Sequence, residues 1–541
     1  MARIARIRTP SPKERRLRSL LESGYFPSEL PPPFTTADFA TKSTTFAKNW
    51  SEENILKFRS KPEHYTIPRY GHARRALSIV NPVNQLLVSK IVSENWTEIQ
   101  TRLKRSNISE FKPEILLDGK GRSVTGVDFD AVSRRKAQIL GSYGKYVKTD
   151  VTRFFPSIYT HSIAWSLVGK AYAKQNYNKP AFKSHFGNQL DRAIGAGQEG
   201  QTIGIPIGPD TSRIVSELIA TEIEESVRLK ISDFDSRAVR YVDDIVIGLR
   251  ESETGAAVLN ELSRALYDYE LELSAEKTTT HGIGCGHAPE WISFIRNFNL
   301  LPAGRQRDDI DSFFEQALHL SDANPRDNVM LFAVKRAVSF AVTLDNKSHL
   351  IRWLLYAARR SPSCLQFVAE HLAATRADKV LPKDEIADFI QQQIPLKAEA
   401  AHTDEVSWLL FWAREIDLKL SGSALEKVKT LRSSVVGLVT LDLHDRGLVQ
   451  GKFKTPEWKS FATSDGLKSE MWLLSYEATK KGWWPGSVKS NFIQSHQFFG
   501  DLWKEDIEFY DPKKAAKKSV TPASQIFRTR GSDAYVGSYP F

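Results

Sequence analysis

The hydrophobic pattern changes along the chain from short strands mixed with helices to amphipathic helices alone. Between residues 143 and 298, short runs of β-branched and aromatic residues alternate with helical periodicity, which predicts an α/β unit. After about residue 301 the strand signal fades and apolar residues recur at helical spacing. Residues 65–80 have β-rich sequence on both sides of Gly71, which predicts a hairpin. An α/β part followed by an all-α part is therefore expected.

The helical part contains an internal echo. The heptapeptide WLLYAAR at residues 353–359 returns as WLLFWAR at residues 408–414, and a weaker copy, WLLSYEA, begins at Trp472. These spacings fit helical pairs stacked as a HEAT-like array, in which each pair buries a face that its neighbour supplies. Leu-rich helices also produce such triplets as ordinary core faces, so both interpretations stay open.

Composition is that of an ordinary globular protein, with 41% hydrophobic and 26% charged residues in a chain of 541, long enough for about three domains. Two cysteines, Cys285 and Cys364, cannot build a disulfide framework or a Cys-rich zinc site, which fits a reducing cytoplasm. No apolar run reaches the ~18–20 residues of a membrane span, and the basic N-terminus lacks a signal-peptide core. A cytoplasmic protein without a membrane partner is expected.

The excess positive charge lies in the first quarter of the chain. Residues 1–140 hold 25 Lys and Arg against 14 Asp and Glu, a net of +11, and the remainder holds 50 of each kind. Basic side chains gain affinity for phosphates by displacing condensed counterions, so we expect this quarter to contact nucleic acid, with Arg134, Arg135 and Lys136 among the contacts. A solvated basic face would give the same counts.

Two adjacent acids interrupt a β-forming run. Asp243 and Asp244 lie within residues 240–247, RYVDDIVI, which predicts a hairpin that presents both carboxylates at its turn. Adjacent like charges repel and strands disfavour Asp, so a divalent cation would resolve the conflict. By itself the motif is weak, because Tyr-x-Asp-Asp arises by chance in chains of this length.

A third acid, Asp150, ends a predicted strand about ninety residues upstream, in YVKTDVTRFF, before a helix that begins near Pro156. Two-metal phosphoryl transfer needs carboxylates from separate strands that converge on ions ~3.5–4 Å apart. Mg²⁺ suits this task because it prefers a few carboxylates plus substrate oxygens. We therefore expect Asp150, Asp243 and Asp244 to hold two Mg²⁺ ions, one for the primer hydroxyl and one for the triphosphate and its leaving pyrophosphate.

Four motifs, in this order and at these spacings, resemble the palm of reverse transcriptases. They are Asp-x-x-x-Phe-Phe from Asp150, the loop GIPIG at residues 204–208, Tyr-Val-Asp-Asp at residues 241–244, and LELSAEKT at residues 271–278. The resemblance implies an α/β fingers and palm polymerase domain over residues 1–300. It also implies an RNA-directed DNA polymerase, a nucleotidyltransferase that takes dNTPs, binds RNA and makes a DNA product, with the three acids as catalytic metal ligands.

The resemblance also assigns roles to basic residues. Lys277 matches the lysine that approaches the pyrophosphate, which makes it a general acid or leaving-group stabiliser. Arg69 and Arg75 match basic positions of the fingers hairpin that grips the triphosphate, Arg75 through the family's Arg-x-Leu.

Other matched residues would contact the nucleotide itself. Phe155 falls where the family places the aromatic ring that excludes the ribose 2′-hydroxyl, although core packing would also account for it. Pro206 and Gly208 belong to the loop that packs against the incoming nucleotide and templating base. Ile207 departs from the common family pattern, where a Gln often touches the nucleotide, and this departure weakens the expectation of conventional templated synthesis.

A narrower resemblance is to bacterial abortive-infection (Abi-like, "unknown group") and other defence-associated reverse transcriptases. It rests on GYFPSELPPPF at residues 24–34, GIPIGPDTSR at residues 204–213, and the aromatic segment from Trp472 to residue 510. It implies an all-α HEAT-like helical-repeat domain at residues 301–510, a homo-oligomer and a role in antiviral, anti-phage defence. Some relatives start on a protein hydroxyl or use a noncoding RNA, and abortive-infection relatives share the departure at Ile207, which therefore does not indicate an inactive enzyme. A flexible basic tail is expected at residues 511–541, with Tyr535 and Tyr539 as possible priming hydroxyls.

Two other functions stay open. A retron-like or mobile-element reverse transcriptase would keep the chemistry, but there a thumb or maturase region would follow the palm. A catalytically idle RNA-binding scaffold would be free to lose an acid, yet all three are present together with Lys277 and Arg75. An RNA polymerase is disfavoured by Phe155.

Overall fold

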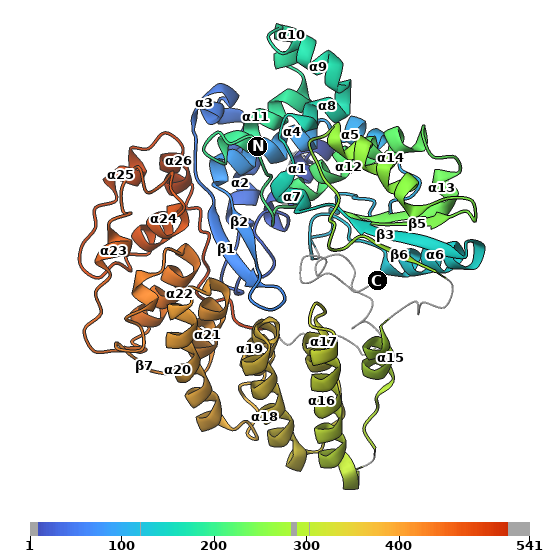
Figure 1. Cartoon of the computed structure of the whole chain (residues 1–541). Coiled ribbons are helices and arrows are strands. Elements are labelled where there is room, and N and C mark those ends of the chain that lie inside the picture. The colour runs from blue at the N-terminus through green and yellow to red at the C-terminus, as the bar shows by residue number, and fades with distance from the viewer. Residues whose placement is uncertain (1–8, 120, 283–288, 302, 518–541) are drawn as a thin grey trace, which may run out of the picture. The chain divides into compact units, whose positions relative to one another are not determined.

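The computed structural model describes residues 9–119, 121–282, 289–301 and 303–517 (Figure 1). Contacts divide these residues into two compact units, each discontinuous in sequence. Unit 1 comprises the described residues of Met1–Phe26, Thr36–Lys61 and Val80–Ile283, and unit 2 those of Pro27–Thr35, Pro62–Ile79 and Gly284–Phe541. The contacts thus group two N-terminal segments with the C-terminal helices. The division into domains 1–300, 301–510 and 511–541 stays a prediction.

The centre of unit 1 is an antiparallel sheet with the strand order β4-β5-β3-β6. Its strands are β3 (Lys145–Asp150), β4 (Ala238–Tyr241), β5 (Asp244–Leu249) and β6 (Thr279–His281). Along its whole length β3 pairs with β5, so that Lys145 lies opposite Leu249 and Asp150 opposite Asp244. The β-branched residues of these strands favour the extended backbone, and the register aligns the acidic ends of β3 and β5.

Helices cover both faces of this sheet (Figure 1). On one face, Ile139 of α6 (Phe129–Ser142) packs against Val239 and Val246. On the other face lie α12 (Asp210–Arg228) and α14 (Gly255–Tyr267), whose apolar residues line a small cavity together with residues of β4 and β5. Successive side chains of a strand alternate between faces, so Val239 faces α6 while Arg240 faces α12.

Three of the remaining helices of unit 1, α1, α3 and α4, begin with a Ser or Asn side chain that caps the helix N-terminus. At α1, the Ser11 hydroxyl accepts a hydrogen bond from the backbone N–H of Glu14, while the Glu14 carboxylate accepts one from the N–H of Ser11. The remaining helices of unit 1 are α1 (Pro12–Glu22), α2 (Ala37–Asn49), α3 (Glu52–Lys57), α4 (Pro82–Glu94), α5 (Trp96–Leu103), α7 (Phe154–Ser157), α8 (Ser162–Val168), α9 (Lys170–Asn176), α10 (Pro180–Lys183), α11 (Phe186–Ala196) and α13 (Phe234–Arg237).

Unit 2 contains the hairpin expected around Gly71. It consists of β1 (Glu63–Pro68) and β2 (Arg74–Ile79), which pair antiparallel, and Gly71 takes a φ of +56° in the turn. The hairpin packs on helices of its own unit: the Tyr65 hydroxyl lies 2.9 Å from the Ser407 hydroxyl, and the Ser433 hydroxyl donates to Glu63 at 2.7 Å. The hairpin prediction is confirmed, and its partners come from the C-terminal part of the chain.

Helices dominate the rest of unit 2, as the sequence predicts. They are α15 (Glu290–Asn297), α16 (Gln306–Ala323), α17 (Val329–Ala337), α18 (Leu344–Arg360), α19 (Leu365–Ala374), α20 (Lys383–Glu399), α21 (Thr403–Glu415), α22 (Ser434–Asp445), α23 (Pro456–Lys459), α24 (Trp472–Lys480), α25 (Asn491–Gln494) and α26 (Phe499–Lys504), with 3-10 turns η1 (Ala303–Arg305), η2 (Pro362–Cys364) and η3 (Val428–Thr430) and the short strands β7 (Leu420–Ser421) and β8 (Val449–Gln450).

The three echoed segments all lie in helices, namely α18, α21 and α24. Their tryptophans make different hydrogen bonds: Trp353 donates to the Asp311 carboxylate at 2.6 Å, whereas Trp408 donates to the carbonyl oxygen of Glu29 at 2.9 Å. Equivalent positions of a regular repeat would share one kind of partner. A HEAT-like array therefore stays a prediction.

The end of the described chain is attached to unit 2. Arg414 donates to the carbonyl oxygen of Lys514 at 3.1 Å, and the N–H of Ala516 donates to Glu415 at 3.2 Å. The rest of the predicted tail lies outside the described residues, as do Tyr535, Tyr539 and Cys285. Within the described ranges, no helix has the length and apolar character needed to cross a membrane.

Candidate active site

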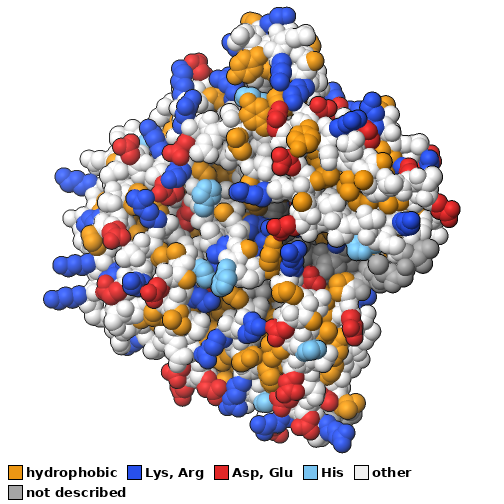
Figure 2. Space-filling view, in the orientation of Figure 1, with side chains coloured by type: hydrophobic (Ala, Val, Ile, Leu, Met, Phe, Trp, Pro, Cys, Tyr) orange, Lys and Arg blue, Asp and Glu red, His pale blue; other side chains and the backbone are white. Residues whose placement is uncertain are grey.

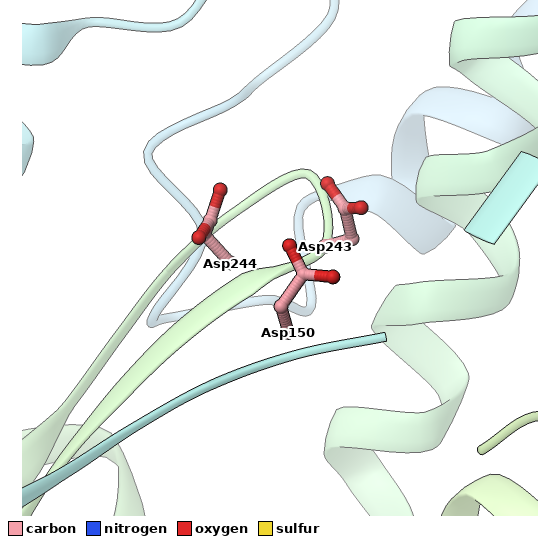
Figure 3. Close-up of side chains that lie close together, drawn as sticks. All are labelled: Asp150, Asp243 and Asp244. Carbon is pink, nitrogen blue, oxygen red and sulfur yellow. The ribbon is translucent and has the colours of Figure 1, made fainter. Parts of the chain in front are cut away.

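Three carboxylates meet where β3 ends and β4 turns into β5 (Figure 3). Asp150 is the last residue of β3 and lies opposite Asp244, the first residue of β5. Asp243 occupies the turn between β4 and β5. One carboxylate oxygen from each of the three side chains lies within 4.8 Å of the other two. The structure therefore brings together three acids that come from separate segments of the sequence.

The turn that carries Asp243 has an unusual backbone. Tyr241 pairs with Asp244, so Val242 and Asp243 alone connect the two strands. Val242 has a φ of +56°, a conformation that β-branched residues rarely adopt. Such strain costs about 1–3 kcal/mol and persists where surrounding contacts hold it. Here Arg240 donates to the carbonyl oxygen of Val242 at 2.8 Å.

Arg240 is itself the centre of a buried ionic network. Its guanidinium lies 2.6 Å from Glu217 and also contacts Glu224, and all three side chains are buried. Burial by itself lowers the pKa of Arg240, but the two carboxylates outweigh burial and raise this pKa above its ordinary value. In the sequence, Arg240 stands out only as a charged residue within an apolar strand beside the two acids.

The charges of the three aspartates are unfavourable without a cation. Burial raises the pKa of Asp243, and the nearby charges of Asp150 and Asp244 raise it further. Burial also raises the pKa of Asp244, again with a contribution from Asp150. Clustered carboxylates with raised pKa values are typical of metal and functional sites. The donor set, carboxylate oxygens alone, fits a hard divalent cation.

Lys277 reaches this cluster because its segment runs beside Asp150. The N–H of Ser274 donates to the carbonyl oxygen of Asp150 at 2.7 Å, and the N–H of Thr152 donates to that of Glu272 at 2.8 Å. This pairing places the Lys277 ammonium 2.5 Å from the Asp150 carboxylate. The fourth motif of the sequence thus meets the first and third in space.

The loop with Pro206 and Gly208 lies along the segment that follows Asp150. The N–H of Ile205 donates to the carbonyl oxygen of Phe155 at 3.0 Å, which joins the loop to the residue expected to exclude the 2′-hydroxyl. Arg122 donates to the carbonyl oxygen of Gly208 at 2.7 Å. Phe155, Pro206 and Gly208 are all buried. Arg122 was missed in the sequence because no motif surrounds it.

Arg69 and Arg75 are placed differently from the other expected residues. They lie on the hairpin of unit 2, whereas the three aspartates belong to unit 1. Within unit 2 the neighbouring Arg74 holds the hairpin, because its guanidinium lies 2.6 Å from Glu405 and also contacts Asp404. The role of Arg69 and Arg75 at a triphosphate stays a prediction.

The expected group of phosphate contacts in α6 needs a correction. Lys136 is only 5% exposed, and its ammonium lies 5.3 Å from the centre of the Tyr241 ring. Arg135 donates to backbone carbonyl oxygens of Asp235 and Ala238. Lys136 is therefore not a surface contact for a nucleic acid, whereas a contact by the half-buried Arg135 or the exposed Arg134 stays a prediction. On the face shown in Figure 2, basic side chains are interspersed with acidic ones.

One family model matches part of the chain. Residues 75–291 match the family model described as reverse transcriptase (RNA-dependent DNA polymerase). No curated protein sequence matches the chain. This match confirms the reverse-transcriptase type of fold for the matched part and the predicted enzyme class, an RNA-directed DNA polymerase.

Solved structures of telomerase show low similarity. For apo telomerase from Candida tropicalis the TM-score is 0.31 at 12% identity, over 77% of this chain and 75% of that chain. For telomerase from Candida albicans with a TWJ fragment of telomeric RNA the TM-score is 0.28 at 13% identity, over 75% and 69%. Similarity at this level supports no conclusion about this chain.

Proposed function

We propose that this RNA-directed DNA polymerase adds deoxynucleotides at Asp150, Asp243 and Asp244 by two-metal catalysis, with Mg²⁺ as the metal. The observation that carries the proposal is the meeting of three carboxylates within 4.8 Å at the ends of paired strands. Two Mg²⁺ ions bound there would activate the primer hydroxyl and neutralise charge on the triphosphate and its leaving pyrophosphate.

Two neighbouring residues would support the transfer. The Lys277 ammonium, 2.5 Å from Asp150, would donate a proton to the leaving pyrophosphate. The ring of Phe155 offers the ribose 2′-hydroxyl no hydrogen bond and would clash with it, which favours dNTPs over ribonucleotides. In this proposal Pro206 and Gly208 hold the loop against the nucleotide and the templating RNA base, and the product is DNA.

For the biological role we propose antiviral defence against phage, in the cytoplasm of a bacterium and as a homo-oligomer. The support is the sequence resemblance to Abi-like reverse transcriptases at residues 24–34 and 204–213. In this setting a noncoding RNA would serve as template, or a protein hydroxyl as primer. Plating phage on cells that express the wild type or an Asp243→Asn variant tests the role. Equal plaque numbers on both, at equal expression, would contradict it.

The chemistry is tested by extension of a primed RNA template with labelled dNTPs. Asp150→Asn and Asp243→Asn are expected to lose incorporation by at least about a thousandfold, because each removes a metal ligand. Asp268→Asn, at the exposed end of α14, is the matched control and should retain activity. Full activity of Asp150→Asn or Asp243→Asn would refute the two-metal assignment.

The same assay separates the alternatives. A catalytically idle RNA-binding scaffold would show no incorporation in the wild type under any divalent metal, yet would bind RNA. A retron-like or mobile-element enzyme would incorporate dNTPs but would leave phage plating unchanged. The phage and extension assays together therefore distinguish all three functions.

A further inference from the structure

A pocket of about 1120 Å³ in unit 1 has no part in the proposed nucleotide transfer. It is lined by residues of helices α8, α9, α10 and α11 and of the segment that follows Asp150. Its walls combine aromatic side chains with basic ones, among them Tyr159, Trp165, Tyr177, Arg153, Lys174 and His161. Small-molecule sites typically enclose about 300–1,000 Å³, so this pocket has room for a larger ligand.

The pocket shares a wall with the loop of the candidate active site. Tyr159 forms a β-bridge with Ile203, and both residues line the pocket. Two residues further along the loop, the N–H of Ile205 donates to the carbonyl oxygen of Phe155. A single stretch of backbone, from Phe155 to Tyr159, therefore connects the proposed nucleotide site with the pocket wall.

The aromatic surface of the pocket is partly fixed and partly open. Trp165 is buried, its ring lies 5.4 Å from that of Tyr159, and the Lys170 ammonium lies 4.5 Å from its centre. Tyr177, in contrast, is 52% exposed although it lines the pocket. Unpaired bases stack on exposed aromatic rings beside basic side chains, and Tyr177 offers such a ring.

The charge of the pocket suits a phosphate backbone. Lys174 and Arg153 line it, and the ring of His161 accompanies them. The His161 Nδ1 lies 2.5 Å from the Asp191 carboxylate, and this hydrogen bond raises the pKa of His161, so that its positive charge persists to higher pH. The lining carboxylates are Asp191, which is engaged with His161, and Glu270, which pairs with Lys170 at 3.2 Å.

We propose that this pocket binds unpaired nucleotides of a single strand beside the active site, by base stacking on the exposed ring of Tyr177 and by phosphate contacts to Lys174 and Arg153. The identity of this ligand rests on the proposed function, because a polymerase handles both a template and a product strand. Unpaired RNA and unpaired DNA share the chemistry that the pocket recognises, namely flat bases and a charged backbone.

Fluorescence anisotropy of labelled uridine and thymidine oligonucleotides about ten nucleotides long tests this proposal with the full chain. Tyr177→Ala is expected to raise the Kd about fivefold or more, since stacking contributes about 1–3 kcal/mol per base. Tyr177→Trp keeps a stacking ring and should restore binding. Lys174→Gln should reduce the slope of log K against log salt concentration by the amount expected for about one lost phosphate contact.

The chain offers close controls for these variants. Tyr172 lies in helix α9, which Tyr177 directly follows in the chain, and it is also 52% exposed but does not line the pocket, so Tyr172→Ala should bind as the wild type does. Lys179→Gln is the matching control for charge at an exposed position. A loss confined to the uridine strand assigns the pocket to the template, and a loss confined to the thymidine strand assigns it to the product.

Unchanged binding by Tyr177→Ala, or an equal loss in Tyr172→Ala, would overturn the proposal. Binding needs no catalysis, so the binding assay is repeated with variants that also carry Asp243→Asn. A failure of the pocket therefore appears as unchanged binding, whereas a failure of the proposed function appears as incorporation that survives Asp243→Asn.

Discussion

Replacing Asp243 with Asn is expected to stabilise the metal-free fold while it abolishes nucleotide incorporation. Burial, together with the charges of Asp150 and Asp244, raises the pKa of Asp243 to about 7, whereas a carboxyl group in the unfolded chain titrates near pH ~4. Between these values the folded protein holds a proton that the unfolded chain has lost, so stability falls as the pH rises.

The magnitude follows from this difference in pKa. Three pH units correspond to roughly 4 kcal/mol of destabilisation above pH ~7. Part of this energy is repulsion among the three carboxylates, and in the wild type Asp150 or Asp244 can take up a proton in place of Asp243, so the full ~4 kcal/mol is not expected. We therefore expect Asp243→Asn to be about 1–3 kcal/mol more stable than the wild type at pH ~8. This advantage should shrink towards pH ~5, where the wild-type carboxyl is already protonated.

Urea unfolding in a chelating buffer measures this difference. Asp210→Asn is the control, because Asp210 is buried in the same unit and lies 2.9 Å from Arg122 and 3.3 Å from Arg213. Removing that charge leaves the buried Arg213 and the mostly buried Arg122 without their carboxylate and should cost about 3–5 kcal/mol. Replacing Asp with Asn should thus raise the free energy of unfolding at position 243 and lower it at position 210.

Added Mg²⁺ provides the complementary measurement. The wild type should gain stability as Mg²⁺ is raised, because the ion binds the folded state, and Asp243→Asn should lose most of this gain. If Asp243→Asn is less stable than the wild type in chelator at pH ~8, the carboxylates do not repel one another as the pKa shifts indicate. The reasoning from charge to metal site would then be refuted.

Further predictions concern the neighbouring residues and the metal. Phe155→Val should raise the ratio of ribonucleotide to deoxynucleotide incorporation by about tenfold, and an unchanged ratio at retained activity would return Phe155 to core packing. Arg240→Met leaves Glu217 and Glu224 buried without their partner and should lower the free energy of unfolding by about 3–5 kcal/mol, whereas the exposed Arg264→Met should change it by less than ~1 kcal/mol. Mg²⁺ affinity, measured by calorimetry, should weaken as the pH falls below ~7, because protons compete for carboxylates of raised pKa; an affinity independent of pH would contradict this.

Local patterns in the sequence were sufficient for the elements that carry the acids. The β-forming run around Asp243 and Asp244 predicts a hairpin, the strand before Asp150 is as expected, and so is the hairpin around Gly71. Such features depend on alternation and turn chemistry within about ten residues, which a sequence displays directly. The order of the motifs then indicated the enzyme class that the family match confirms.

Tertiary structure alone decided which distant residues meet. Lys136 was expected on the surface, but α6 buries it against Tyr241. The hairpin with Arg74 belongs to unit 2 because carboxylates about 330 residues further along the chain supply its partners. A sequence pattern shows that a residue is charged and on which face of an element it lies, but the counter-charge can come from anywhere in the chain. For this reason the network around Arg240 and the aromatic pocket beside the active site emerged only when the chain was folded.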